Sequence, residues 1–229
     1  MKNKYQQLDS AIHILYRNDR DIIKEQLNRF ENLIDQFNSH LKAGELHYFS
    51  TPGRTEIGGN HTDHNNGRVL AASVNLDSIA VVSKSRGEKV ELYSAGYNNP
   101  FIVDLNQLEP VDQENGTTSS LIRGVASRFK QLGYKIGGFN ACITSDVLPG
   151  SGLSSSASID VLIAEIFNAL YNENKIEVEI LAQTGQYAEN IYFGKPSGLM
   201  DQMACAIGGI ISIDFEAPEN PKVKKVDFD

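Results

Sequence analysis

The sequence Leu148-Pro-Gly-Ser-Gly-Leu-Ser-Ser-Ser-Ala-Ser158 runs directly into an apolar stretch from Ile159 to Leu170. Its glycines at 150 and 152 permit tight turns and a close approach of the backbone to a ligand, and the three serines that follow offer hydroxyl groups. Unpaired amides and aligned peptide dipoles make the first turn of a helix electropositive. The stretch therefore predicts a phosphate-binding loop that opens a helix. A helix capped by its own serines would fit the same residues.

The helix after this loop is expected to be mostly buried. Ile159, Leu162, Ile163, Ile166 and Leu170 recur at helical spacing, and small apolar residues form a second stripe beside them. A strand expected over residues 138–145 leads into the loop, which is the context that a phosphate loop requires. The loop is not a Walker loop, because no Lys follows the glycines at the required position.

Composition limits the classes of function. The 229 residues carry a net charge of -8, and no clustered basic surface of the kind that binds nucleic acid is evident. No apolar run approaches the roughly 20 residues that span a bilayer, and the first residues lack the apolar core of a secretory signal. We therefore expect a cytoplasmic protein that binds neither membrane nor nucleic acid. Cys142 and Cys205 are expected to be buried and reduced.

The order of the elements favours an α+β fold. Residues 1–46 are expected to form a helical segment, with two helices broken near residues 18–21 and no role in chemistry. Strands and helices then follow without the regular alternation of a doubly wound sheet. We expect strands over residues 69–82, 89–94, 101–105 and 209–214, helices over 117–132 and 176–192, and a turn over 194–202 that opens a short helix.

A second stretch that can carry chemistry is Thr51-Pro-Gly-Arg-Thr-Glu-Ile-Gly-Gly-Asn-His-Thr-Asp-His-Asn-Asn-Gly67. It is rich in polar groups and has no apolar run, so we expect a loop, which a ligand or its own contacts must order. A hydrated loop or a metal site are the alternatives to a binding loop. A zinc site would need further His or Cys ligands at suitable spacing, which the sequence does not offer.

Three stretches together resemble galactokinases, which are members of the GHMP superfamily of small-molecule kinases. They are Pro52-Gly-Arg-Thr-Glu-Ile-Gly-Gly-Asn-His-Thr-Asp63, the Gly/Ser loop from Gly150 to Ser158, and Gly198-Leu-Met-Asp-Gln202. Their order and separation match the N-terminal portion of the family. The resemblance implies a domain of the ribosomal protein S5 domain 2-like type over residues 47–229. Family members continue with a further domain, so the second domain is expected to be absent or truncated.

The resemblance also implies roles for individual residues. Asp201 would accept the proton of the sugar's anomeric hydroxyl, and Arg54 would lie beside it and balance charge on the transferring phosphoryl group. Asn60, His61, Asp63 and Asp201 are the implied sugar-binding residues. Ser156 and Glu189 would hold Mg²⁺, which prefers oxygen ligands. The implied ATP-binding residues are Gly150, Ser151, Gly152, Leu153, Ser154, Ser155 and Ser156.

Two departures from the family pattern concern the sugar. Asn60 stands where family members carry a Glu that contacts the sugar, and Glu56 stands at an Asn position. His64 replaces a usual Tyr. An amide in place of a carboxylate changes which hydroxyls are well paired. The expected reaction is ATP-dependent phosphorylation of galactose at its anomeric oxygen. The alternatives are another acceptor, such as N-acetylgalactosamine, arabinose or a mevalonate-type alcohol, and a sugar- and ATP-binding sensor or fragment without turnover. The oligomeric state is not set by the sequence.

Overall fold

A computed structural model describes residues 2–16, 19–41 and 44–227, the side chains from residue 8 onward. A seven-stranded mixed sheet runs through the molecule in the order β4-β3-β5-β2-β6-β7, and β1 pairs with β2 off this path. The strands are β1 (Leu46–Gly58), β2 (Arg68–Lys84), β3 (Lys89–Ser94), β4 (Phe101–Asp104), β5 (Phe139–Ser145), β6 (Ile210–Asp214) and β7 (Lys222–Lys225). All these pairings are antiparallel except that of β3 with β5. The expected α+β fold is confirmed.

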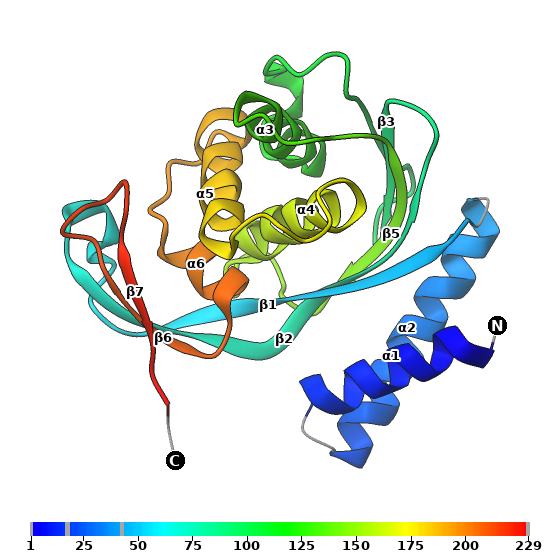
Figure 1. Ribbon diagram of the computed structural model, residues 1–229, viewed down its shortest axis with the longest axis horizontal. Coiled ribbons are helices and arrows are strands. Elements are labelled where there is room, and N and C mark those ends of the chain that lie inside the picture. The colour runs from blue at the N-terminus through cyan, green and yellow to red at the C-terminus, as the bar shows by residue number, and fades with distance from the viewer. Residues whose placement is uncertain (1, 17–18, 42–43, 228–229) are drawn as a thin grey trace.

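Helices cover both faces of the sheet (Figure 1). They are α1 (Lys2–Leu15), α2 (Arg20–His40), α3 (Thr118–Gln131), α4 (Ser155–Tyr171), α5 (Val178–Ala188) and α6 (Met200–Ile207). Helices α3 to α6 gather on one face, and α1 and α2 lie across the other. Because side chains alternate along a strand, β2 serves both cores. Ala80 and Val82 pack in the cluster under α3, α4 and α5, whereas Ile79 and Val81 pack against α1 and α2.

Helix α4, which follows the Gly/Ser loop, is the central helix of the main core. Its Leu162, Ile163, Ile166 and Phe167 are at most 1% exposed. They belong to one buried cluster with residues of β2, β3 and β5 and of the neighbouring helices. The expectation of a mostly buried helix at this place is confirmed. A buried helix is held rigidly, so its first turn offers a fixed site at the surface.

The N-terminal helices form an amphipathic pair on the sheet. Phe30, Leu33, Ile34 and Phe37 of α2 are buried in the same cluster as β2 and β5 residues. Asp19 caps α2 by accepting hydrogen bonds from the amides of Asp21 and Ile22. Helix α1 lies within the helical segment expected for residues 1–46. The break expected near residues 18–21 includes residue 18, which is outside the described residues, and α2 already begins at Arg20.

The expectation of a loop over residues 51–67 was wrong for its first half. Strand β1 continues to Gly58, and residues 52–58 pair with residues 70–77 of β2. The register shifts between Pro52 and Arg54 and again between Glu56 and Gly58. Pairing with β2 satisfies the backbone hydrogen bonds of residues 52–58, so this segment forms a strand although it has no apolar run. Such bulges re-aim side chains next to functional sites, and here they set the direction of Arg54.

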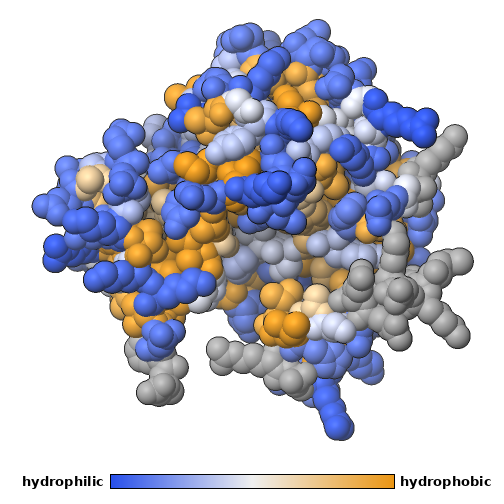
Figure 2. All heavy atoms as spheres, viewed as in Figure 1, coloured by the Kyte–Doolittle hydropathy of each residue, from blue (hydrophilic) through white to orange (hydrophobic). Residues whose placement is uncertain are grey.

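Two further findings concern the apolar character of the helices and the state of the cysteines. Within the described residues, no helix is both long enough and apolar enough to cross a bilayer. Cys142 and Cys205 are buried and unpaired, as expected. Figure 2 shows hydrophilic atoms over much of this view, with apolar atoms gathered where α6 approaches the strands and at the end of α1. Ile14 and Leu15, at that end of α1, are 80% and 58% exposed.

The packing of α2 on the sheet predicts a large effect for Phe37→Ala. The Phe37 side chain is completely buried, so its removal leaves a cavity and lowers the free energy of unfolding by about 3–5 kcal/mol. Urea unfolding followed by circular dichroism measures this change. Asn38→Ala, on the exposed side of the same helix, is the control and should change stability by less than about 0.5 kcal/mol. A Phe37→Ala protein as stable as this control would show that α2 is not part of the cooperative core.

Candidate active site

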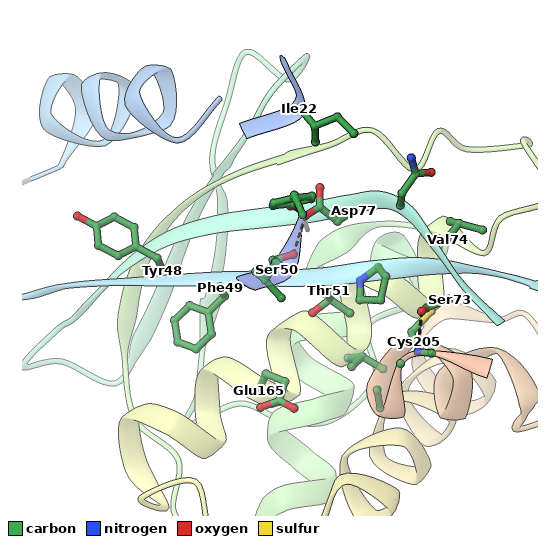
Figure 3. Close-up of a pocket in the computed structure, with 18 of the residues that line it drawn as sticks. Ile22, Tyr48, Phe49, Ser50, Thr51, Ser73, Val74, Asp77, Glu165 and Cys205 are labelled. Carbon is green, nitrogen blue, oxygen red and sulfur yellow. Dashed lines mark hydrogen bonds between the residues drawn. The ribbon is translucent and has the colours of Figure 1, made fainter. Parts of the chain in front are cut away.

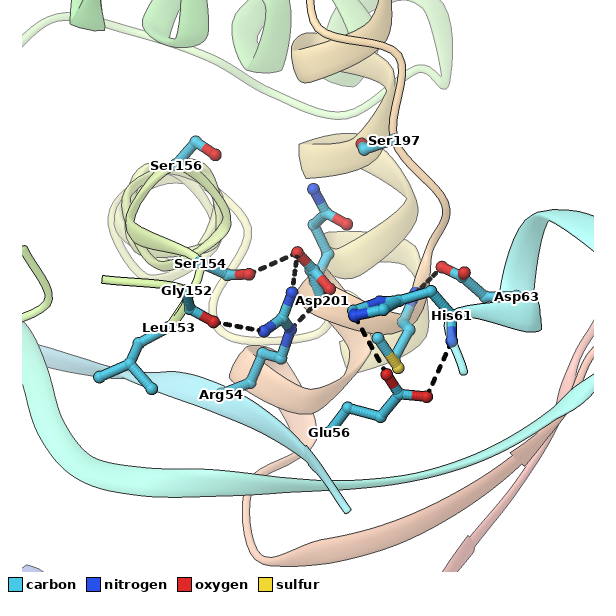
Figure 4. A network of polar contacts seen from close by, with 12 residues as sticks. Arg54, Glu56, His61, Asp63, Gly152, Leu153, Ser154, Ser156, Ser197 and Asp201 are labelled. Carbon is cyan, nitrogen blue, oxygen red and sulfur yellow. Dashed lines mark hydrogen bonds and ion pairs between the residues drawn. The ribbon is translucent and has the colours of Figure 1, made fainter. Parts of the chain in front are cut away.

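An ion pair between Arg54 of β1 and Asp201 of α6 forms the centre of the candidate site (Figure 4). Arg54 Nε and a terminal nitrogen donate to the two carboxylate oxygens of Asp201 at 2.6 and 2.7 Å. The remaining terminal nitrogen of Arg54 donates to the carbonyl of Gly152 at 2.8 Å. The guanidinium therefore joins the Gly/Ser loop to the stretch from Gly198 to Gln202. Two parallel hydrogen bonds to a carboxylate fix orientation as well as charge.

Strand β1 approaches the Gly/Ser loop very closely at Gly53. A Cβ at this position would lie 2.8 Å from the carbonyl oxygen of Leu153, too near for any other residue without a shift. The next amide, that of Arg54, donates to the same carbonyl at 3.0 Å. This contact registers the strand against the loop. The glycine of the Pro-Gly-Arg motif is thus required by packing.

The Gly/Ser loop presents an uncapped helix start. Ser154, in left-handed conformation with φ of 60°, precedes α4. Its hydroxyl donates to Asp201, and within the described part of the chain no side chain caps the first turn of α4. The alternative of a helix capped by its own serines is therefore wrong. Amides left free at a half-buried helix start that follows an exposed loop are what an anion such as phosphate requires.

A second polar group lies beside this loop, where α5 ends in a π-turn over Glu189–Phe193. Ser156 Oγ donates to Glu189 Oε1. The ammonium of Lys195 contacts both residues, 2.8 Å from Glu189 Oε1 and 3.3 Å from Ser156 Oγ. The Glu189 side chain is completely buried, and that of Lys195 is 54% exposed. The two residues expected to bind the metal are thus brought together, and the ammonium of Lys195 contacts both of them.

The chemistry of this pair fits Mg²⁺. A hydroxyl and a carboxylate are hard oxygen donors, and Mg²⁺ in phosphate-transfer sites takes one or two such protein ligands beside phosphate oxygens. Among the described residues, no cluster of three or more His, Cys, Asp or Glu side chains could hold a metal by itself. The Ser156–Glu189 pair therefore suits a metal whose coordination is completed by phosphate oxygens. Among the described residues, His61 and His64 belong to no cluster that could bind zinc.

Buried polar side chains hold Glu189 from behind. Ser197 Oγ and Gln202 Nε2 donate to Glu189 Oε2 at 2.9 and 2.7 Å. Gln202 Nε2 also lies 3.3 Å from Asp160 Oδ2. Burial, and then the neighbouring charge of Glu189, raise the pKa of the Asp160 carboxyl well above its usual range. The side chain that anchors Gln202 is thus favoured in its neutral form.

Residues 56–61 form a separate polar cluster at the end of β1. Asn60 and His61 are both in left-handed conformation, with φ of 54° and 51°. The carboxylate of Glu56 holds this turn, because Oε1 accepts from the His61 amide at 3.0 Å and Oε2 lies 3.1 Å from His61 Nε2. Figure 4 shows His61 above Glu56, on the side of the cluster that faces Asp201. A carboxylate is therefore present beside His61 although residue 60 is an amide.

Asp63 joins the same region to the start of α6. Its Oδ2 accepts a hydrogen bond from the Met200 amide at 3.2 Å, so it serves the first turn of the helix that carries Asp201. A Cβ at position 198 would overlap this carboxylate, so the Gly198 of the third motif makes room for Asp63. The implied sugar-binding role of His61, Asp63 and Asn60 stays a prediction.

A large cavity lies elsewhere (Figure 3). It has a volume of about 980 Å³ and lies where β1 and β2 separate, between Tyr16 and the α4 residue Glu165. Its buried carboxylate, Asp77, is already paired with Arg29, Tyr16 and Ser50. The Arg54–Asp201 pair, which contacts the glycine-rich loop through the Gly152 carbonyl, is therefore the better candidate site than this cavity.

Several residues of the site were not expected from the sequence. Ser154 was assigned to ATP alone, and its contact with Asp201 depends on the left-handed turn. Gln202 and Ser197 appear only through their contacts with Glu189. Lys195 could have been found, since it is the cation in the segment between Glu189 and Asp201.

Comparison with known proteins matches the same regions. Residues 120–209 match the N-terminal domain of GHMP kinases, and residues 35–84 match the galactose-binding signature of galactokinases. The galactokinase of Clostridium tetani is 35% identical over 165 residues, which are 72% of this chain and 42% of that protein. The galactokinase of Fusobacterium nucleatum is 36% identical over 182 residues, 78% of this chain and 46% of that protein. The chain spans less than half the length of these curated relatives.

A solved structure agrees with these matches. The crystal structure of Lactococcus lactis galactokinase complexed with galactose superposes with a TM-score of 0.76 at 30% sequence identity. The superposition covers 84% of this chain and 50% of that one. The arrangement of sheet and helices described above is therefore shared with that structure.

The buried carboxyl of Asp160 predicts a pH-dependent gain in stability for Asp160→Asn. Since the pKa of Asp160 is raised on folding, the folded chain binds this proton more tightly than the unfolded chain. The free energy of unfolding therefore falls as the pH rises above about 4, where the unfolded chain loses the proton. The amide of Asp160→Asn does not ionise, so this fall in the free energy of unfolding is absent from the variant. Melting temperatures followed by circular dichroism should therefore show an advantage of Asp160→Asn that grows from about pH 5 to about pH 8. The exposed Asp35→Asn is the control, and a pH-independent difference between Asp160→Asn and the unmodified chain would contradict the prediction.

Proposed function

The chain belongs to the GHMP kinase family and corresponds to the N-terminal portion of its galactokinases, and from this premise we propose that it takes part in ATP-dependent phosphorylation of a sugar at its anomeric oxygen. The observation that carries the proposal is the ion pair of Arg54 with Asp201 at the mouth of an uncapped helix start. A carboxylate, a fixed cation and a phosphate-binding loop are the parts that phosphoryl transfer needs.

The proposed reaction moves the γ-phosphoryl group of ATP to the sugar. The anomeric oxygen forms a bond to the γ-phosphorus, the bond from that phosphorus to the β,γ-bridging oxygen breaks, and ADP leaves. Asp201 accepts the proton of the anomeric hydroxyl. Its carboxylate has lone pairs beyond those that Arg54 and Ser154 occupy, because two carboxylate oxygens accept about four hydrogen bonds. Arg54 fixes the direction of this base.

The residues of the Gly/Ser loop supply the phosphate site. The free amides at the start of α4 and the hydroxyls of Ser155 and Ser156 would contact the triphosphate. Ser156 and Glu189 would hold Mg²⁺, which when bound neutralises charge on the phosphate oxygens. Because α4 is buried along its length, the loop is held in place relative to Asp201, and little reorganisation is needed when the nucleotide binds.

Galactose is the sugar that we propose, supported by the match of residues 35–84 to the galactose-binding signature. Asn60, His61 and Asp63 would contact its hydroxyls. The exchange of Asn and Glu between positions 56 and 60, compared with the family pattern, keeps one carboxylate in the cluster. Glu56 stands against His61, so it would orient that side chain toward a sugar hydroxyl. N-acetylgalactosamine and arabinose are the rival acceptors, because a displaced carboxylate alters the pairing of individual hydroxyls.

The assignment of Asp201 predicts that Asp201→Asn abolishes phosphoryl transfer. Loss of a general base lowers the rate by roughly 10²–10⁴-fold. Phosphorus NMR of the purified chain with MgATP and galactose measures the reaction through the appearance of galactose 1-phosphate and ADP. Asp35→Asn makes the same chemical change at an exposed position of α2 and should leave the rate unchanged. Product formation by Asp201→Asn within twofold of the unmodified chain would exclude it as the base, and no product from galactose or the rival sugars with the unmodified chain would contradict the proposed function.

The position of Glu56 predicts a defect in sugar binding for Glu56→Asn. Without the carboxylate His61 loses two contacts, so the KM for the sugar should rise by about tenfold, which corresponds to about 1.4 kcal/mol. Initial rates with galactose, N-acetylgalactosamine and arabinose give KM for each. The double change Glu56→Asn, Asn60→Glu restores the family pattern and should recover the affinity for galactose. Thr55→Ala, at the exposed neighbouring residue of β1, is the control. An unchanged KM in Glu56→Asn would remove this residue from the sugar site.

A further inference from the structure

We propose that Lys195 occupies the metal position in the nucleotide-free protein and exchanges it for Mg²⁺, after which its ammonium pairs with the phosphates of the nucleotide. The inference rests on the proposed function, since it concerns the same phosphate site. It adds a residue to which neither the sequence motifs nor the comparisons assign a role. Lys195 lies in the segment that joins the π-turn carrying Glu189 to the helix carrying Asp201.

The contacts of Lys195 are those that a metal at this position would make. Its ammonium is 2.8 Å from Glu189 Oε1 and 3.3 Å from Ser156 Oγ. Ser156 and Glu189 are the two residues that would hold Mg²⁺. The carboxylate of Glu189 is completely buried, and a buried charge is costly unless a partner neutralises it. In the absence of a metal, Lys195 supplies that positive charge.

Only one oxygen of Glu189 is open to this exchange within the described residues. Oε2 is already held by Ser197 and Gln202, at 2.9 and 2.7 Å. Oε1, in contrast, meets Lys195 and Ser156. A divalent cation and an ammonium cannot share this one oxygen, because two positive charges a few ångströms apart repel strongly in a partly buried site. Binding of Mg²⁺ therefore requires the ammonium to leave.

The Lys195 side chain can move, and the proposed phosphate site lies within its reach. Its backbone is anchored, because its amide donates to the carbonyl of Glu189 at 3.2 Å, but its side chain is 54% exposed and flexible. Arg54 cannot play this part, since Asp201 and Gly152 hold its guanidinium. Ser156 is in the first turn of α4, where the phosphates are proposed to bind. An ammonium displaced from Ser156 thus remains within reach of phosphate oxygens, for which Lys is a well-suited ligand.

The proposal predicts opposite effects of Lys195→Met on two binding constants. Methionine keeps the length of the side chain and removes its charge. Without nucleotide, Mn²⁺ should bind at least about fivefold more tightly to Lys195→Met than to the unmodified chain, because no cation competes for Glu189. The Mn²⁺–ATP complex should bind about tenfold more weakly, because a phosphate contact is lost. Electron paramagnetic resonance of free Mn²⁺ measures the first constant, and calorimetric titration with Mn²⁺–ATP measures the second.

Two further variants complete the experiment. Lys175→Met removes an exposed lysine that pairs with Glu173 and should change neither constant. Glu189→Gln should abolish the tight Mn²⁺ site in both the unmodified and the Lys195→Met background, which places the ion at Glu189. Mn²⁺ affinity without nucleotide that is unchanged or reduced in Lys195→Met would overturn the inference, as would undiminished affinity for Mn²⁺–ATP. Failure of the unmodified chain to bind Mn²⁺–ATP at all would contradict the proposed function, whereas the nucleotide-free Mn²⁺ comparison decides the exchange by itself.

Discussion

The ion pair between Arg54 and Asp201 joins three parts of the chain that are far apart in sequence. It ties strand β1 to helix α6, and through the Gly152 carbonyl it reaches the loop before α4. Both side chains are largely buried, so loss of either partner would leave an uncompensated charge and cost about 3–5 kcal/mol. The contact therefore holds the motifs together at the position where charge is needed. The same contacts of Arg54 thus fix both the arrangement of the site and the packing of β1 against the loop.

Glu189 imposes a second requirement, because it is a carboxylate with no exposed surface. Ser156, Ser197, Gln202 and Lys195 each donate to it. Behind them, burial and then the charge of Glu189 raise the pKa of the Asp160 carboxyl well above its usual range, which disfavours a second negative charge in the same interior. In the polar interior between α4, α5 and α6, Glu189 therefore has the buried Asp160 carboxyl on its inner side and the cationic Lys195 on its solvent side.

Much of the fold could be predicted because its elements carry their own signals. The helical spacing of Ile159 to Leu170 and the apolar run of β2 identify core elements, and the glycines at 150 and 152 mark the loop between strand and helix. The path of β1 through residues 52–58 could not be predicted in this way. Those residues are polar, and what makes them a strand is pairing with β2 across a shifted register, a long-range contact with no local pattern. The family resemblance indicated Asp201, Arg54, Ser156 and Glu189, but not Lys195, which contacts the last two.

The burial of α4 explains why the site can be open and still ordered. The loop at residues 148–152 is exposed, and a glycine-rich loop gains conformational entropy when it is free. It is held by its two ends: β5 precedes it in the sheet, and α4, whose inner side chains are at most 1% exposed, follows it. The Leu153 carbonyl, which accepts from the Arg54 amide, holds the middle. The core and β1 therefore order the phosphate loop, and the first-turn amides of α4 are available to a ligand.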